Sequence, residues 1–152
     1  MAALLREEAL VFETQSAQHT FKLALPDASL PVCGDPSRLK QVVGNLLSNA
    51  VKYSPQGGEV EVAGEKMGAF VHIGVRDHGV GIPADQHERI FTKFFRGDAP
   101  GRGISGTGLG LTVSREIVEA HGGRIGFTSA ADAGSTFWVE LPLFLNDSLS
   151  KV

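Results

Sequence analysis

The chain has 152 residues, 42% of them hydrophobic, and a formal net charge of −3. These values fit one globular domain and exclude the basic surface that neutralises a nucleic-acid backbone, so we expect no nucleic-acid partner. Cys33 is the single cysteine, and no Cys/His cluster has zinc spacing, which predicts a reducing, cytoplasmic compartment. No run of residues resembles a signal peptide or approaches bilayer-spanning length, so we expect no direct membrane contact.

Hydrophobic spacing predicts the first elements. Residues 4–12 have helical periodicity with no capping residue before them, so residues 1–18 are interpreted as a helical lead-in. Residues 19–25 alternate as a short strand, and then Asp35 and Pro36 place a capping acid before a helix-opening proline. The helix that follows carries one apolar stripe, made of Leu39, Val42, Val43, Leu46, Leu47, Ala50 and Val51.

Alternation and glycines predict the rest of the chain. Residues 59–66 and 69–77 form a hairpin around Met67-Gly68, and a glycine-punctuated loop follows. The later elements are a short helix at 84–90, a candidate lid at 97–108, a helix at 109–120 and strands at 124–130 and 135–141.

This order predicts the fold class. Its helices can all lie on one side of a mixed, mostly antiparallel sheet, which makes an α+β two-layer sandwich with about three helices. We expect residues 19–145 to form the domain and residues 146–152 to be a flexible tail.

The segment NLLSNAVKYS carries polar residues opposite its apolar stripe. Asn45, Asn49 and Lys52 recur at i, i+4 and i+7, so two amides and a cation share one helix face. Amide oxygens suit Mg²⁺ and an ammonium suits phosphate, although a solvated helix face explains the segment better when it is taken alone. Tyr53, the only tyrosine, is placed either to stack on a purine or to pack in the core.

The segment DHGVGI places an acid at the end of an apolar strand. Gly79 and Gly81 allow close ligand approach, and the Asp77 carboxylate is suited to accept the exocyclic amine of adenine. A tight turn with a solvated aspartate explains the motif equally well by itself. We interpret His78 as a bystander.

The segment GTGLGL opens the last predicted helix. Its unpaired backbone N–H groups favour phosphate binding. A loop rather than a strand precedes it, which argues against a Rossmann site, and the chain has no GxxxxGK[ST] loop. Arg96, at the hinge of the candidate lid, and Arg102, within it, are either phosphate contacts or solvated side chains.

Together these segments resemble the histidine-kinase branch of the GHKL superfamily, which also contains gyrase, mismatch-repair and heat-shock chaperone ATPases. The match runs from about Leu23 to Pro142 and comprises NLLSNAVKYS as the N box, DHGVGI and GTGLGL as the glycine boxes, FTKFFR as the F box and GSTFWVELP as the closing strand. The resemblance implies the Bergerat fold of a histidine-kinase catalytic domain that binds ATP and Mg²⁺ under a lid.

The resemblance also implies a role for individual residues. Asn49 corresponds to the magnesium ligand, Asn45 to a second polar contact near the phosphates, Lys52 and Arg96 to phosphate contacts, Tyr53 to the adenine-stacking residue and Asp77 to the adenine selector. Thr136 corresponds to a hydroxyl that fixes the adenine through the water network of the aspartate. The other nucleotide-binding positions implied are Gly79, Gly81, Ile82, Gly106, Thr107, Gly108, Leu109 and Gly110.

The identity of residue 45 bears on the reaction. The ATPase branches have a glutamate at this position, and the amide of Asn45 cannot serve as a general base for water. The γ-phosphoryl group is therefore expected to pass to a histidine on a separate dimerisation domain, and indirectly to a response regulator. None of the five histidines has the context of that acceptor. On this interpretation residues 1–18 are a remnant of the linker from the dimerisation domain.

Two alternatives remain at this point. An anti-sigma factor of the serine-kinase type has the same fold, but the phenylalanine-rich segment that begins at Phe91 is typical of histidine kinases. A non-catalytic docking module is the second alternative, and the intact motifs argue against it.

Overall fold

The computed structural model describes residues 1–27, 29–92 and 110–145. Its elements are α1 (Ala2–Gln15), β1 (His19–Ala24), α2 (Pro36–Lys52), β2 (Gly58–Met67), β3 (Phe70–Asp77), the 3₁₀ helix η1 (Ala84–Gln86), α3 (Gly110–Ala120), β4 (Arg124–Ser129) and β5 (Ser135–Pro142). The predicted order of helices and strands is confirmed.

The short helix predicted at 84–90 is wrong in extent, because only one 3₁₀ turn forms. The chain continues from η1 in tight i to i+3 turns, with Arg89 N–H donating to Gln86 and Thr92 N–H donating to Arg89. The His87 side chain also hydrogen-bonds back to the Ile82 carbonyl oxygen at 2.8 Å. The segment is therefore tied back to the preceding loop, residues 78–83, which we call the glycine loop, instead of extending as an α-helix.

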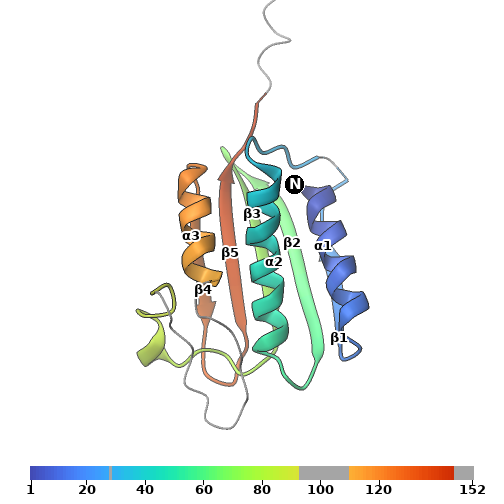
Figure 1. The fold of residues 1–152 in the computed structure, drawn as a ribbon, viewed down its shortest axis with the longest axis vertical. Helices are drawn as coiled ribbons and strands as arrows, with labels where there is room; N and C mark the ends of the chain where they lie inside the picture. The colour runs from blue at the N-terminus through green and yellow to red at the C-terminus, as the bar shows by residue number, and fades with distance from the viewer. Residues whose placement is uncertain (28, 93–109, 146–152) are drawn as a thin grey trace, which may run out of the picture.

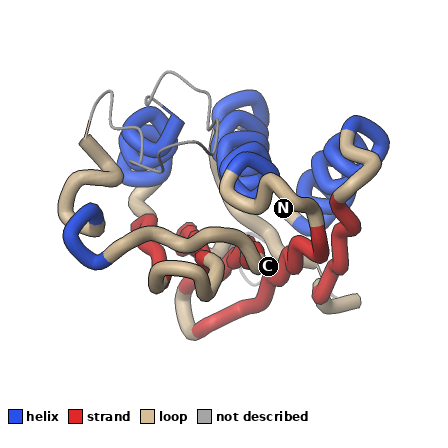
Figure 2. Tube along the Cα trace, turned by 90° about the horizontal axis from the view of Figure 1, so that it is seen from below, coloured by secondary structure: helices blue, strands red, loops and turns tan. Residues whose placement is uncertain are grey.

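The five strands form one mixed sheet in the order β1-β2-β3-β5-β4. β1 pairs with β2 in parallel, and all other pairs are antiparallel. The three α-helices lie together on one face of this sheet, as Figures 1 and 2 show. The α+β two-layer sandwich predicted from the element order is confirmed.

Side chains alternate between the two faces of the sheet. In β3, Val71, Ile73 and Val75 are buried beneath the helices, whereas the side chains between them point to the opposite, uncovered face. β5 has the same alternation, with Phe137 and Val139 on the inner face. We call the helix-covered side the inner face and the uncovered side the outer face.

The central helix α2 begins as the sequence predicts. The Asp35 carboxylate accepts hydrogen bonds from the N–H groups of Ser37 and Arg38 at 3.0 and 3.3 Å, and Pro36 occupies the first turn. The apolar stripe of α2 is buried against the sheet.

The helix α1, expected as part of a lead-in, packs in the same layer as α2. Its Leu5 is fully buried in the common core, and its Glu8 lies 3.6 Å from the ammonium of Lys40 on α2. None of the helices in the described ranges has the length and hydrophobicity needed to cross a membrane.

Candidate functional site

The inner-face end of β3 carries a buried acid. Asp77 is 2% exposed and is paired with Ser135 at the start of β5. Its carboxylate accepts the N–H of Gly79 at 2.9 Å and the N–H of Ser135. Burial raises the pKa of Asp77 above the usual value, while these two N–H donors and His78 act in the opposite direction. Asp77 is therefore a buried acceptor that is held by the main chain.

The loop after Asp77 lies directly against the end of α2. A Cβ on Gly79 would collide with the carbonyl oxygen of Tyr53, so only glycine permits this approach. The same carbonyl accepts the N–H of Val80 at 2.9 Å. Tyr53 is half-buried, and its pKa is raised by burial and by the nearby charge of Asp77. The structure thus brings together the predicted pair Tyr53 and Asp77.

The turn between β4 and β5 holds this loop from the other side. Gly134 N–H donates to the Gly79 carbonyl at 3.1 Å, and Asp132 N–H donates to the Val80 carbonyl at 2.6 Å. Gly81 has φ of +68°, and a Cβ there would collide with the carbonyl oxygen that follows β4. The loop is fixed by main-chain contacts on two sides.

Two serines that the sequence analysis did not identify complete this region. Ser129 accepts the N–H of Ile82 at 2.7 Å and donates to the Gly134 carbonyl at 3.0 Å. Its hydroxyl also lies 2.8 Å from the hydroxyl of Ser135. Strand alternation was the available signal, because it places Ser135 on the same face as the buried side chains of β5.

The prediction for Thr136 is wrong in its placement. Thr136 pairs with Arg76 and lines an outer-face groove that also includes Glu61 and His72. Asp77 is on the inner face, and successive residues of a strand point to opposite faces. The hydroxyl on the aspartate side of the sheet therefore belongs to Ser135 and not to Thr136.

The polar face of α2 is directed toward α3. The side-chain NH₂ group of Asn45 donates to the Gly110 carbonyl at 3.2 Å and to the Ser114 hydroxyl at 3.1 Å. Asn49, one turn further along, is half-buried and has no side-chain hydrogen bond within the described residues. Lys52 is exposed and forms no ion pair with any described residue. About 12 Å of helix separates Asn45 from Tyr53.

The F-box segment is described only at its start. The Phe91 carbonyl accepts the hydroxyl of Thr112 on α3 at 2.9 Å, and its ring contacts Phe127 with centroids 6.0 Å apart. The predicted positions Arg96, Arg102, Gly106, Thr107, Gly108 and Leu109, and with them the candidate lid, lie outside the described residues.

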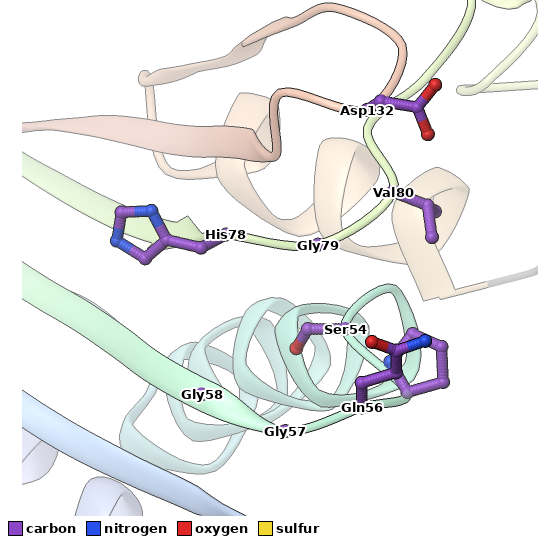
Figure 3. A pocket seen from close by; sticks show the side chains of 9 residues that line it. Ser54, Gln56, Gly57, Gly58, His78, Gly79, Val80 and Asp132 are labelled. Carbon is purple, nitrogen blue, oxygen red and sulfur yellow. The ribbon is translucent and has the colours of Figure 1, made fainter.

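An open cleft of about 740 Å³ adjoins the glycine loop (Figure 3). Its lining residues are Ser54, Pro55, Gln56, Gly57, Gly58, His78, Gly79, Val80 and Asp132. Asn45, Asn49 and Asp77 do not line it, so Gly79 is the one predicted binding residue among those that line this cleft.

A mixed sheet covered on one face by three helices, with a buried aspartate facing an amide-bearing helix, defines an ATP-binding domain of the histidine-kinase catalytic type. The family of histidine kinase-, DNA gyrase B- and HSP90-like ATPases matches residues 34–145, and the chain belongs to this family.

Individual relatives agree with this assignment. The sensor histidine kinase WalK of Bacillus subtilis is 42% identical over 135 residues, which are 86% of this chain and 22% of WalK. The catalytic domain of histidine kinase ThkA, in a nucleotide-free form, superposes with a TM-score of 0.80 at 32% identity, covering 94% of this chain and 92% of that one. Full-length ShkA in complex with AMPPNP gives 0.78 at 28% identity, covering 93% of this chain and 29% of that one. The chain thus spans less than a third of the curated WalK.

Proposed function

We propose that this domain binds Mg-ATP and donates the γ-phosphoryl group to a histidine on the separate dimerisation domain of a sensor kinase. The observation that carries this proposal is the Asp77 carboxylate, buried beside Tyr53 and held by two main-chain N–H groups. A buried acceptor that is aimed by the main chain is suited to read an amine on a flat, largely apolar base.

The adenine end of the site is built around this carboxylate. Asp77 accepts the exocyclic amine of adenine, and Tyr53 provides an aromatic face for the base. Gly79, Gly81 and Ile82 shape the wall through their main-chain contacts. Ser135 takes the part first expected of Thr136, because it holds Asp77 from the neighbouring strand.

The phosphate end lies along the polar face of α2. The Asn49 side-chain oxygen is suited to Mg²⁺, which prefers hard oxygen ligands, and bound Mg²⁺ would neutralise phosphate charge. Asn45 and Lys52 provide the neighbouring polar and cationic contacts. Arg96 and the segment from Gly106 to Gly110 complete this end through charge and backbone N–H groups. The complex of the similar protein ShkA with AMPPNP supports a triphosphate nucleotide as the ligand.

Asn45 favours transfer over hydrolysis. Its NH₂ group is used by Gly110 and Ser114 of α3, and a neutral amide has no basicity with which to activate water. The site then serves to position the triphosphate until a protein nucleophile arrives. We infer that the parent kinase presents that histidine in the cytoplasm and passes the phosphoryl group on to a response regulator.

The test uses this chain alone and then with a dimerisation domain that carries the acceptor histidine. Calorimetry is expected to detect one Mg-ATP per chain, and radiolabelled ATP is expected to leave no acid-labile label on the isolated chain. Label is expected on the added domain. Absence of ATP binding by folded protein contradicts the proposal, and binding without transfer would instead favour a non-catalytic docking module.

A further inference from the structure

A second cluster of ligand side chains lies on the outer face, near the ends of β2 and β3 that border the glycine loop. Glu59, Glu61 and His78 place one ligand atom each within 4.8 Å of one another. Glu61 pairs with Arg76, and continuing this antiparallel register brings His78 opposite Glu59. Two carboxylates at i and i+2 therefore share one face with an imidazole from the neighbouring chain segment.

The chemistry of this donor set selects a particular class of metal. An imidazole with two carboxylates suits Zn²⁺ and related divalent transition metals, whereas Mg²⁺ prefers oxygen ligands throughout. We propose that Glu59, Glu61 and His78 form a binding site for one divalent transition-metal ion such as Zn²⁺, separate from the predicted magnesium ligand Asn49.

The electrostatics of the cluster favour occupation by a cation. The Arg76 guanidinium and the His78 imidazole each lie 3.8 Å from the same oxygen of Glu61, which is too long for a hydrogen bond. Arg76 is 56% exposed, so its side chain can withdraw into solvent without a buried penalty. Lys22 is the cross-strand neighbour of Glu61 on β1 and is also exposed. The two carboxylates contribute a formal charge of −2, which Arg76 and Lys22 offset from solvent and which a divalent ion bound between the three ligands would neutralise directly.

The position of His78 means that a bound metal would affect the glycine loop. His78 stands between Asp77 and Gly79, whose N–H holds the Asp77 carboxylate, and it also lines the cleft shown in Figure 3. A metal bound to His78 and to β2 would tie the start of the glycine loop to a second strand. Metal binding is therefore expected to raise the melting temperature of the folded chain.

The test is a ZnCl₂ titration of the full chain without nucleotide, followed by calorimetry, in a Cys33→Ser background that removes the exposed thiol. We expect one Zn²⁺ per chain and at least about tenfold weaker binding for His78→Ala, since loss of even a supporting contact costs that much. Glu59→Gln is expected to weaken binding as well. CoCl₂ is a second probe, because its visible absorption should change on binding and should not change with His78→Ala.

His72→Ala is the matched control. His72 is another outer-face imidazole, with Nδ1 3.5 Å from Glu140, but no third metal-capable group completes its surroundings among the described residues. Zinc affinity that is unchanged by His78→Ala, or lost with His72→Ala, overturns the proposal, as does the absence of saturable uptake. His78 is 47% exposed, so its truncation should leave the fold intact, which circular dichroism checks. Because the titration contains no nucleotide, its failure is independent of the proposed kinase function.

Discussion

Neighbouring residues where β3 ends and β5 begins have very different surroundings on the two faces of the sheet. On the inner face, Asp77 and Ser135 are buried and bonded by main-chain groups. On the outer face, Arg76 and Thr136 form the next pair along the same strands, and Arg76 lies 3.8 Å from Glu61 in solvent. A buried carboxylate that accepts two N–H groups is held in one orientation for a ligand, whereas an exposed ion pair is screened by salt.

The largest expected effect tests this contrast through ligand binding. Asp77→Asn replaces the charged acceptor with a neutral amide of the same shape, and a hydrogen bond to a charged group contributes about 1.5 to 3 kcal/mol. We expect Mg-ATP affinity to fall by about ten- to a hundredfold, as measured by calorimetry. Arg76→Gln on the outer face is the control, and equal effects of the two changes would remove the distinction between the faces.

Two glycine-to-alanine substitutions test whether the glycine loop and the outer face of the sheet differ in how much stability a substitution costs. Gly79→Ala forces a Cβ against the Tyr53 carbonyl, and overpacking of this kind typically costs about 1 to 3 kcal/mol. Gly74→Ala on the outer face meets its nearest atom, on Thr136, at 4.0 Å and is expected to change stability by no more than about 0.5 kcal/mol. Urea unfolding of both variants measures the difference. A stable Gly79→Ala protein would mean that the loop can move away from α2.

The paired hydroxyls give a smaller effect. Ser135→Ala removes a buried hydroxyl that contacts the half-buried hydroxyl of Ser129, and it is expected to cost about 0.5 to 1.5 kcal/mol of stability, with a modest loss of ATP affinity. Thr136→Val keeps the shape of the outer-face side chain and removes only its hydroxyl, so we expect neither property to change. ATP affinity that fell with Thr136→Val and not with Ser135→Ala would restore the original prediction for Thr136.

The smallest effect is a pH dependence. Burial raises the pKa of Asp77, so the folded state binds this proton more tightly than the unfolded chain does. The contribution of Asp77 to stability is then fully present below the unfolded pKa of about 4 and is lost as the pH rises through the higher folded value. Asp77→Asn, which cannot ionise, should gain stability relative to the native protein as the pH rises from about 4 through the folded pKa. A stability difference that stays constant over this range in urea unfolding would contradict the raised pKa.

Hydrophobic periodicity was sufficient to predict most of the fold. The stripe of α2, its Asp35 cap and the alternating strands each leave a local pattern, and these elements formed as predicted. The parallel pairing of β1 with β2 joins segments that are distant in sequence and leaves no such pattern. The short helix was predicted too long because backbone turns and the His87 side chain, rather than periodicity, shape that segment.

The sequence motifs also indicated which residues would lie near one another in the candidate site, and Thr136 is the exception. Motif spacing located Tyr53, Asp77 and the glycines, which the structure places in contact. Thr136 was misplaced because a shift of one residue along a strand exchanges the two faces, and the motif alone did not indicate which hydroxyl faces inward. The Ser129 contacts depend on a turn geometry that only the structure provides.

The contact between Gly79 and the Tyr53 carbonyl bears on how this domain can diversify. At this contact the wall of the site consists of main-chain groups, so exchanging other side chains does not reshape it. A residue larger than glycine at position 79 would instead require the loop and the end of α2 to move apart. If the site binds a nucleotide as proposed, adaptation to a different base must therefore act through side chains near this wall, chiefly Asp77 and Tyr53.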